Sequence, residues 1–144
     1  MNKEDMIFVF GSNEAGIHGA GAALFALRNR GARLGLPFGL EGRSFAVPTK
    51  GKRRIPNGPG GGRRYEVGDP LSLAEIKRYV DSFLWHAEKN PDETFQVTAI
   101  GCGYAGFRNE QMAPLFADSP ANCRMPPEWR EELSALPPER FWEY

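Results

Sequence analysis

The chain has 144 residues, with a formal net charge of zero and an isoelectric point near 6.7. This length predicts one domain, residues 1–144, with a core of its own. The charge balance disfavours a protein whose main partner is a nucleic-acid backbone, because such proteins normally carry a strong basic excess. Two cysteines are too few for a disulfide framework, which favours a reducing, cytoplasmic location.

Signals for export and for membrane insertion are missing from the sequence. The first six residues include acids and lead into only a short apolar run, which differs from a signal peptide. No run of about 20 apolar residues is present to span a bilayer. We therefore expect a soluble protein without a membrane partner.

The first third of the chain predicts two buried strands with a helix between them. Residues 7–10 form a short apolar run that ends at Gly11, as is typical of a buried parallel strand. Residues 20–30 are rich in helix formers and end with basic side chains before a glycine. Residues 44–49 predict the second strand, and Pro48 indicates its end.

Residues 51–70 are rich in glycine, proline and arginine, and they predict a long flexible loop. Loops of this length inside a compact domain are usually functional lids or solvated insertions, and the sequence leaves both interpretations open. The basic side chains in this stretch and directly before it are Lys50, Lys52, Arg53, Arg54, Arg63 and Arg64. Their charge would attract a phosphorylated ligand.

The second half of the chain continues the alternation of helix and strand. Ser72 and Glu75 have the spacing of a capping box, and an amphipathic pattern continues from there to Asn90. Residues 95–100 predict a third strand, residues 109–116 a short helix and residues 122–125 an extended segment. A terminal helix is expected to begin at the prolines of positions 126 and 127.

This order of elements predicts an α/β fold. Strands that alternate with helices form right-handed crossovers, which produce a mostly parallel sheet with helices on both faces. The expected architecture therefore has three layers, α/β/α.

Two segments rich in glycine, residues 11–23 and 100–107, each follow a predicted strand and precede a predicted helix. Glycine at such a turn lets the backbone approach a ligand closely, and the first N–H groups of a helix point toward an anion. Because ligands bind at the carboxyl ends of parallel strands, the two turns predict a phosphate-binding crevice. Two turns in one small domain could hold two linked phosphates.

Other chemistries find weaker support in the sequence. Cys102 lies in the second turn without an adjacent basic partner, so a small buried residue is a better interpretation than a nucleophile. Neither histidine has a partner at ligand spacing, so no metal is expected. The glycines at positions 58–62 are not followed by the Gly-Lys-Ser/Thr of a P-loop.

The chain resembles the macrodomains, which bind ADP-ribose and its derivatives. The residues that carry the resemblance are Phe10-Gly11-Ser12-Asn13, His18-Gly19-Ala20-Gly21-Ala22-Ala23-Leu24-Phe25, Ala46-Val47-Pro48-Thr49-Lys50 and Ala99-Ile100-Gly101-Cys102-Gly103. Their order is similar to the branch of small ADP-ribosyl-protein hydrolases and ADP-ribose phosphate phosphatases. The match covers residues 7–116, which is most of the predicted domain.

The resemblance implies roles for residues of both turns. Asn13 would hydrogen-bond the distal ribose, since its amide has both donor and acceptor groups. Tyr104 or Phe107 would cover a ribose or the adenine, unless these rings only pack at the end of the sheet. The residues that the resemblance places at the ligand are Gly19, Ala20, Gly21, Ala22, Thr49, Gly101, Cys102, Gly103, Tyr104, Ala105, Gly106 and Phe107.

The resemblance also indicates candidates for catalysis. Some relatives use a lysine after the second strand as nucleophile, together with an aspartate two residues beyond the last glycine of the IGCG turn. Lys50 occupies or adjoins the lysine position, but Ala105 holds the place of the aspartate. His18 is the alternative acid or base, because the ordinary pKa of histidine lies near neutrality, although a solvent-facing turn histidine is an equal possibility.

Three classes of function remain open from the sequence. The first is hydrolysis of an ADP-ribosyl or ADP-ribose phosphate linkage, with ADP-ribosylated protein or nucleic acid as the carrier and no cofactor. The second is a non-enzymatic reader or sink for an ADP-ribose-type ligand. The third is another Rossmann-like nucleotide-binding module, because a fold by itself does not identify a function.

Overall fold

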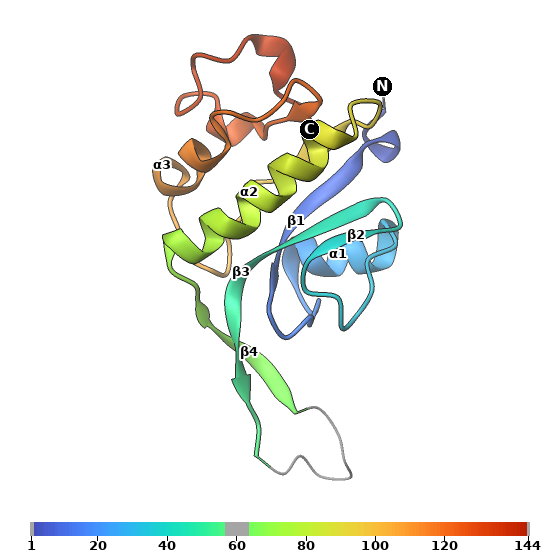
Figure 1. Ribbon diagram of the computed structural model, residues 1–144, viewed down its shortest axis with the longest axis vertical. Coiled ribbons are helices and arrows are strands. Elements are labelled where there is room, and N and C mark those ends of the chain that lie inside the picture. Colours follow the sequence, from blue (N-terminus) through green and yellow to red (C-terminus); the bar gives the residue numbers. More distant parts are fainter. Residues whose placement is uncertain (1, 57–63, 144) are drawn as a thin grey trace.

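The computed structural model describes residues 2–56 and 64–143. This part of the chain forms an α/β protein with a mixed, mostly parallel six-strand sheet and three α-helices (Figure 1). The strands are β1 (Ile7–Asn13), β2 (Gly39–Glu41), β3 (Ser44–Arg54), β4 (Tyr65–Pro70), β5 (Phe95–Val97) and β6 (Cys123–Arg124). The helices are α1 (Gly21–Asn29), α2 (Leu73–Lys89) and α3 (Asn109–Met112).

The strand order in the sheet is β2-β3-β1-β5-β6, and β4 pairs with β3 outside this path. β1 is parallel to both of its neighbours, β3 and β5, and β5 is parallel to β6. β2 and β4 are both antiparallel to β3. The parallel centre of the sheet was expected from the sequence, whereas β2 was not.

Side chains of the central strand divide the core into two parts, because successive residues of a strand point to opposite faces. Ile7 and Val9 pack in the larger cluster with α2. Phe8 and Phe10 pack on the other face against the alanines of α1. The helices α1 and α2 therefore cover opposite faces of the sheet, as the alternation of elements predicts.

The start of α2 confirms the predicted capping box. The Ser72 hydroxyl oxygen accepts a hydrogen bond from the Glu75 N–H at 3.1 Å, and the Glu75 carboxylate accepts one from the Ser72 N–H at 3.2 Å. This reciprocal pair satisfies N–H groups that the first helical turn leaves without partners.

The prediction of a loop over residues 51–70 is wrong for the described part of this range. β3 passes through Pro48 and continues to Arg54, and β4 returns antiparallel to its outer half, with Lys52 opposite Val67 and Arg54 opposite Tyr65. The tip of the expected loop, residues 57–63, lies outside the described residues. Figure 1 shows β3 and β4 leaving the body of the molecule as a two-stranded arm. Pro48 does not end β3, because the pairing with β1 continues past it to Lys50.

The predicted terminal helix is also wrong. The segment instead contains two short 3-10 helices, Pro127–Trp129 and Pro138–Arg140, joined by turns. Trp129 and Leu133 are buried in the core, so tertiary packing rather than the local helix signal determines the backbone here. The third strand ends at Val97, earlier than the expected position 100, and the helix predicted over residues 109–116 is α3 followed by the 3-10 helix Ala113–Phe116.

Among the described residues, no helix has the length and apolar character that crossing a membrane requires.

Candidate functional site

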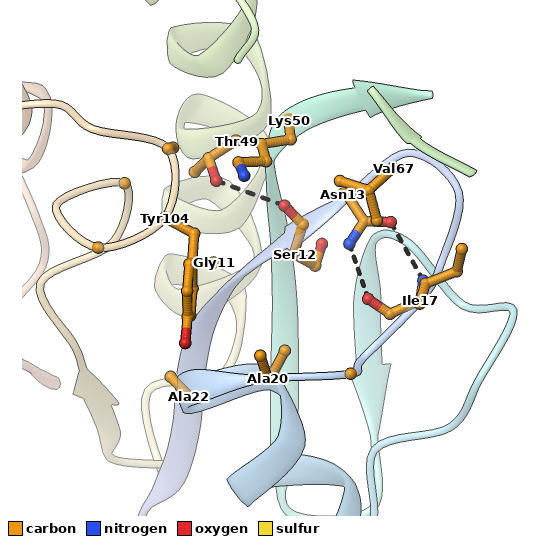
Figure 2. Close-up of a pocket in the computed structure, with 15 residues that line it drawn as sticks. Gly11, Ser12, Asn13, Ile17, Ala20, Ala22, Thr49, Lys50, Val67 and Tyr104 are labelled. Atoms are coloured by element: carbon orange, nitrogen blue, oxygen red, sulfur yellow. Dashed lines mark hydrogen bonds between the residues drawn. The ribbon is translucent and has the colours of Figure 1, made fainter. Parts of the chain in front are cut away.

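A cavity of about 360 Å³ lies where β1 ends, between the two glycine-rich turns (Figure 2). Ten residues predicted for the site line it: Asn13, Gly19, Ala20, Ala22, Thr49, Lys50, Gly101, Gly103, Tyr104 and Ala105. Five lining residues were missed: Gly11, Ser12, Ile17, Ala23 and Val67. The first four lie within the first glycine-rich turn, residues 11–23, so that turn could have indicated them. Val67 belongs to β4, which the sequence did not reveal.

The turn after β1 is held by Asn13. Its side-chain amide donates to the Ile17 carbonyl at 2.7 Å and accepts from the Ile17 N–H at 3.1 Å. Gly16 has a φ of +69°, and a Cβ at this position would approach the Gly35 backbone to 2.8 Å. Each polar atom of the Asn13 amide retains one unused hydrogen-bonding position, so the residue can hold the turn and still contact a ligand.

Residues of both turns that line or adjoin the cavity have backbone N–H groups without a hydrogen-bond partner among the described residues. In the first turn they belong to Gly19, Ala20, Gly21, Ala22 and Ala23, none of which donates to another described residue. Ala20, the N-cap of α1, makes no side-chain capping bond. In the second turn, the N–H groups of Gly101, Gly103, Tyr104 and Ala105 likewise donate to no described residue. Such paired rows of free donors favour an anionic ligand.

The second turn is compact and carries an exposed aromatic ring. The Phe107 N–H donates to the Gly101 carbonyl at 2.9 Å, and the Gly106 N–H donates to the Gly103 carbonyl at 3.0 Å. Tyr104 is 74% exposed. Its ring extends toward the start of α1, as Figure 2 shows, and a Cβ on Gly21 would lie 3.0 Å from it. The ring therefore bridges the two turns across the mouth of the cavity.

Lys50 supplies the positive charge of the cavity wall. Its ammonium group lies 5.9 Å from the centre of the Tyr104 ring. Lys50 and Tyr104 carry the titratable side chains among the described lining residues. Glu14 follows Asn13 in the chain but does not line the cavity. Its carboxylate accepts a hydrogen bond of 2.7 Å from the Tyr79 hydroxyl on α2.

The structure does not bring His18 to the cavity. This side chain is only 1% exposed, and its ring meets the Phe10 ring edge-on at 5.3 Å between centres. Burial lowers the pKa of His18, and neither nitrogen of its ring has a hydrogen-bond partner among the described residues. A neutral core histidine is the consequence, so we leave His18 out of the proposed chemistry. The sequence suggested that His18 is a turn residue. Its burial depends on residues 33–36, which are distant in the chain, so the local sequence around His18 does not reveal it.

Four other predicted residues adjoin the cavity without lining it: Gly21, Cys102, Gly106 and Phe107. Phe107 packs against the core on the α2 side, which is the alternative role that the sequence left open. Burial raises the pKa of the Cys102 thiol, whose S–H donates to the Ile100 carbonyl at 3.7 Å. A thiol of raised pKa is a poor nucleophile, in agreement with the sequence interpretation.

Tyr79 provides a test of how Glu14 is held. The hydrogen bond to Glu14, together with burial, raises the pKa of Tyr79 to about 12 from an ordinary value of 10.0. The phenol form therefore favours the folded state, and this contribution is present below pH 10 and is lost as the pH rises toward 12. We expect Tyr79→Phe to cost about 1 kcal/mol near neutrality, because the pair is partly solvated.

The measurement is urea unfolding of both proteins from about pH 8 to about pH 11. The difference in unfolding free energy between wild type and Tyr79→Phe should shrink above pH 10. A difference that stays constant over this range would contradict the assigned hydrogen bond.

Comparison with protein-family models, curated proteins and solved structures found no match for this chain. Within residues 2–56 and 64–143, no three histidine, cysteine or acidic side chains gather where they could hold a metal ion. The function must therefore be inferred from the geometry of the cavity.

Proposed function

We propose that this protein is a macrodomain-like module, with a three-layer α/β/α fold, that binds ADP-ribose or a related NAD-derived nucleotide. The observation that carries the proposal is that residues with free backbone N–H groups line one cavity from two glycine-rich turns. A diphosphate presents oxygen acceptors on two adjacent phosphorus atoms, so one turn can hold each phosphate.

The remaining wall of the cavity suits the other parts of such a ligand. Asn13 has a free donor and acceptor position for the neighbouring hydroxyls of a ribose. The exposed ring of Tyr104 offers a face for a ribose or a base, and Lys50 balances phosphate charge. A volume of about 360 Å³ lies within the range of small-molecule sites.

Hydrolysis is the second candidate, and Lys50 is the observation that favours it. Its amine reaches the cavity beside Asn13 and could stabilise negative charge on a leaving group or on an attacking water. Ala105 lines the same cavity where some macrodomains carry an aspartate, so Lys50 has no carboxylate there to accept its proton. We therefore assign Lys50 an electrostatic role. The protein is an enzyme if it releases ADP-ribose from modified protein or nucleic acid, or phosphate from ADP-ribose phosphate. A lysine adduct trapped by borohydride would overturn the electrostatic role of Lys50.

Calorimetric titration with ADP-ribose, NAD and AMP tests binding directly. Excess ADP-ribose at about 100 times its dissociation constant should stabilise the fold by about 2.7 kcal/mol. Absence of both heat and thermal shift would refute the proposal. Equal affinity for AMP would favour a different nucleotide-binding module.

Lys50→Ala should weaken ADP-ribose binding by about tenfold, the loss expected for one charge-assisted contact of ~1.4 kcal/mol. The dependence of affinity on salt should flatten as well, since one cation at the ligand is removed. Lys89→Ala is the matched control, because it removes the same charge from the exposed end of α2. Equal effects of the two substitutions would show that Lys50 acts only through the net charge.

A further inference from the structure

The two faces of the β3–β4 arm differ in charge. Residues opposite each other in an antiparallel pair share a face, so Lys52, Val67, Arg54 and Tyr65 lie on one side. Arg53 and Glu66 lie on the other side. The arm thus presents two chemically distinct surfaces, defined by the register of its strands.

Acidic side chains of the described arm are confined to the second face. Glu66 and Asp69 both pair with Arg53, at 3.3 Å and 3.5 Å. The charged side chains of the first face in the described arm are the cations Lys52 and Arg54. We call Lys52, Arg54 and Tyr65 the cationic track. A net charge of zero for the whole chain conceals this separation, because the balancing acids lie elsewhere.

The cationic track leads to the cavity. Val67, which shares the face of Lys52, lines the cavity, and so does Lys50 at the base of the arm. The track also carries an aromatic surface: Tyr65 is 41% exposed, and the Lys52 ammonium lies 4.5 Å from the centre of its ring. Cations beside an exposed ring form the combination that holds a phosphate backbone and stacks a base.

From this arrangement we infer that the protein binds single-stranded nucleic acid along the cationic track, with the strand leading toward the cavity. A single strand matches the track better than an acidic peptide does, because only the nucleic acid supplies a base for Tyr65 as well as anions for Lys52 and Arg54. A rigid duplex keeps its bases stacked inside, away from such a ring. The inference stands whether or not ADP-ribose is the ligand of the cavity.

The test is fluorescence-anisotropy titration of the whole protein with a labelled oligothymidylate of about 12 nucleotides. Lys52→Ala/Arg54→Ala should weaken binding at least tenfold. It should also reduce the slope of log affinity against log salt by about 1.4, the value for two phosphate contacts on a single strand. The control Arg28→Ala/Lys89→Ala removes two exposed cations from α1 and α2 and should leave the affinity near that of wild type.

Tyr65 separates stacking from charge. Tyr65→Ala should weaken binding about fivefold or more, whereas Tyr65→Phe should retain it, because the ring face is what a base contacts. The altered residues do not line the cavity, so the thermal shift with ADP-ribose should be unchanged in every variant. A retained ADP-ribose shift with lost oligonucleotide binding would support the track independently of the cavity ligand.

Several results would overturn the inference. The inference is wrong if the wild-type protein does not bind the oligonucleotide. It is also wrong if the control Arg28→Ala/Lys89→Ala weakens binding as much as Lys52→Ala/Arg54→Ala does. Competition by polyglutamate that matches competition by unlabelled oligonucleotide at equal charge would indicate an acidic peptide instead. Unaltered binding by Tyr65→Ala would remove the argument for a stacked base.

Discussion

Gly103→Val is expected to abolish ADP-ribose binding and to leave the fold intact. A Cβ at Gly103 would meet no atom within 4 Å, and the residue lines the cavity. Because a Cβ there has open space around it, we expect a valine at this lining position to obstruct the ligand and not the fold. The backbone there needs no positive φ, unlike that of Gly21 at +57°, so strain does not confuse the result.

Calorimetry with ADP-ribose and thermal unfolding without ligand measure the two expectations separately. Gly103→Ala, which adds a single methyl group, should give a smaller loss of affinity than Gly103→Val. Full affinity in the valine variant would mean that the ligand binds elsewhere. Loss of affinity together with a large loss of thermal stability would instead show that Gly103 is required for folding rather than for contact with the ligand.

Trp129→Ala should reduce the free energy of unfolding by about 3–5 kcal/mol, the usual cost of removing a large buried aromatic side chain. Trp129 is 0% exposed, its ring packs on Phe116, and its indole N–H donates to the Asn109 side chain at 3.0 Å. The irregular C-terminal segment is therefore anchored to α3 through this residue. Loss of the indole leaves both a cavity and an unpaired amide.

Trp85→Ala is the matched control, because Trp85 on α2 is 63% exposed. Its unfolding free energy should differ from that of wild type by no more than about 0.5 kcal/mol. Urea unfolding followed by circular dichroism measures both variants. Similar losses in the two variants would contradict the assignment of Trp129 to the core.

Local patterns in the sequence were sufficient for the central elements. The apolar run at residues 7–10, the helix formers after residue 20 and the capping box at Ser72 each predict an element that the structure contains. Both glycine-rich turns could be placed for the same reason, since strand-to-helix turns follow from the elements on either side. Most of the residues that line the cavity follow from these two turns.

Long-range pairing accounts for what the sequence did not reveal. Nothing in the glycine-rich and proline-rich composition of residues 51–70 shows that Lys52 will pair with Val67. The burial of His18 depends on Phe10 and on backbone far along the chain, and so it is invisible in the turn itself. The last residues resemble a helix, but Trp129 and Leu133 are buried by neighbours that only the folded chain supplies.

The unequal division of the core gives the two long helices different resistance to local opening. α2 buries Ile76, Val80, Phe83 and Ala87, whereas α1 buries only two alanines and begins without a side-chain cap. Amide hydrogens of α1 should consequently exchange with solvent through smaller fluctuations than those of α2. An anion held at the first turn of α1 would act as the missing cap. Part of the binding free energy of such a ligand is therefore spent on ordering α1, so occupancy of the cavity and protection of this helix rise together.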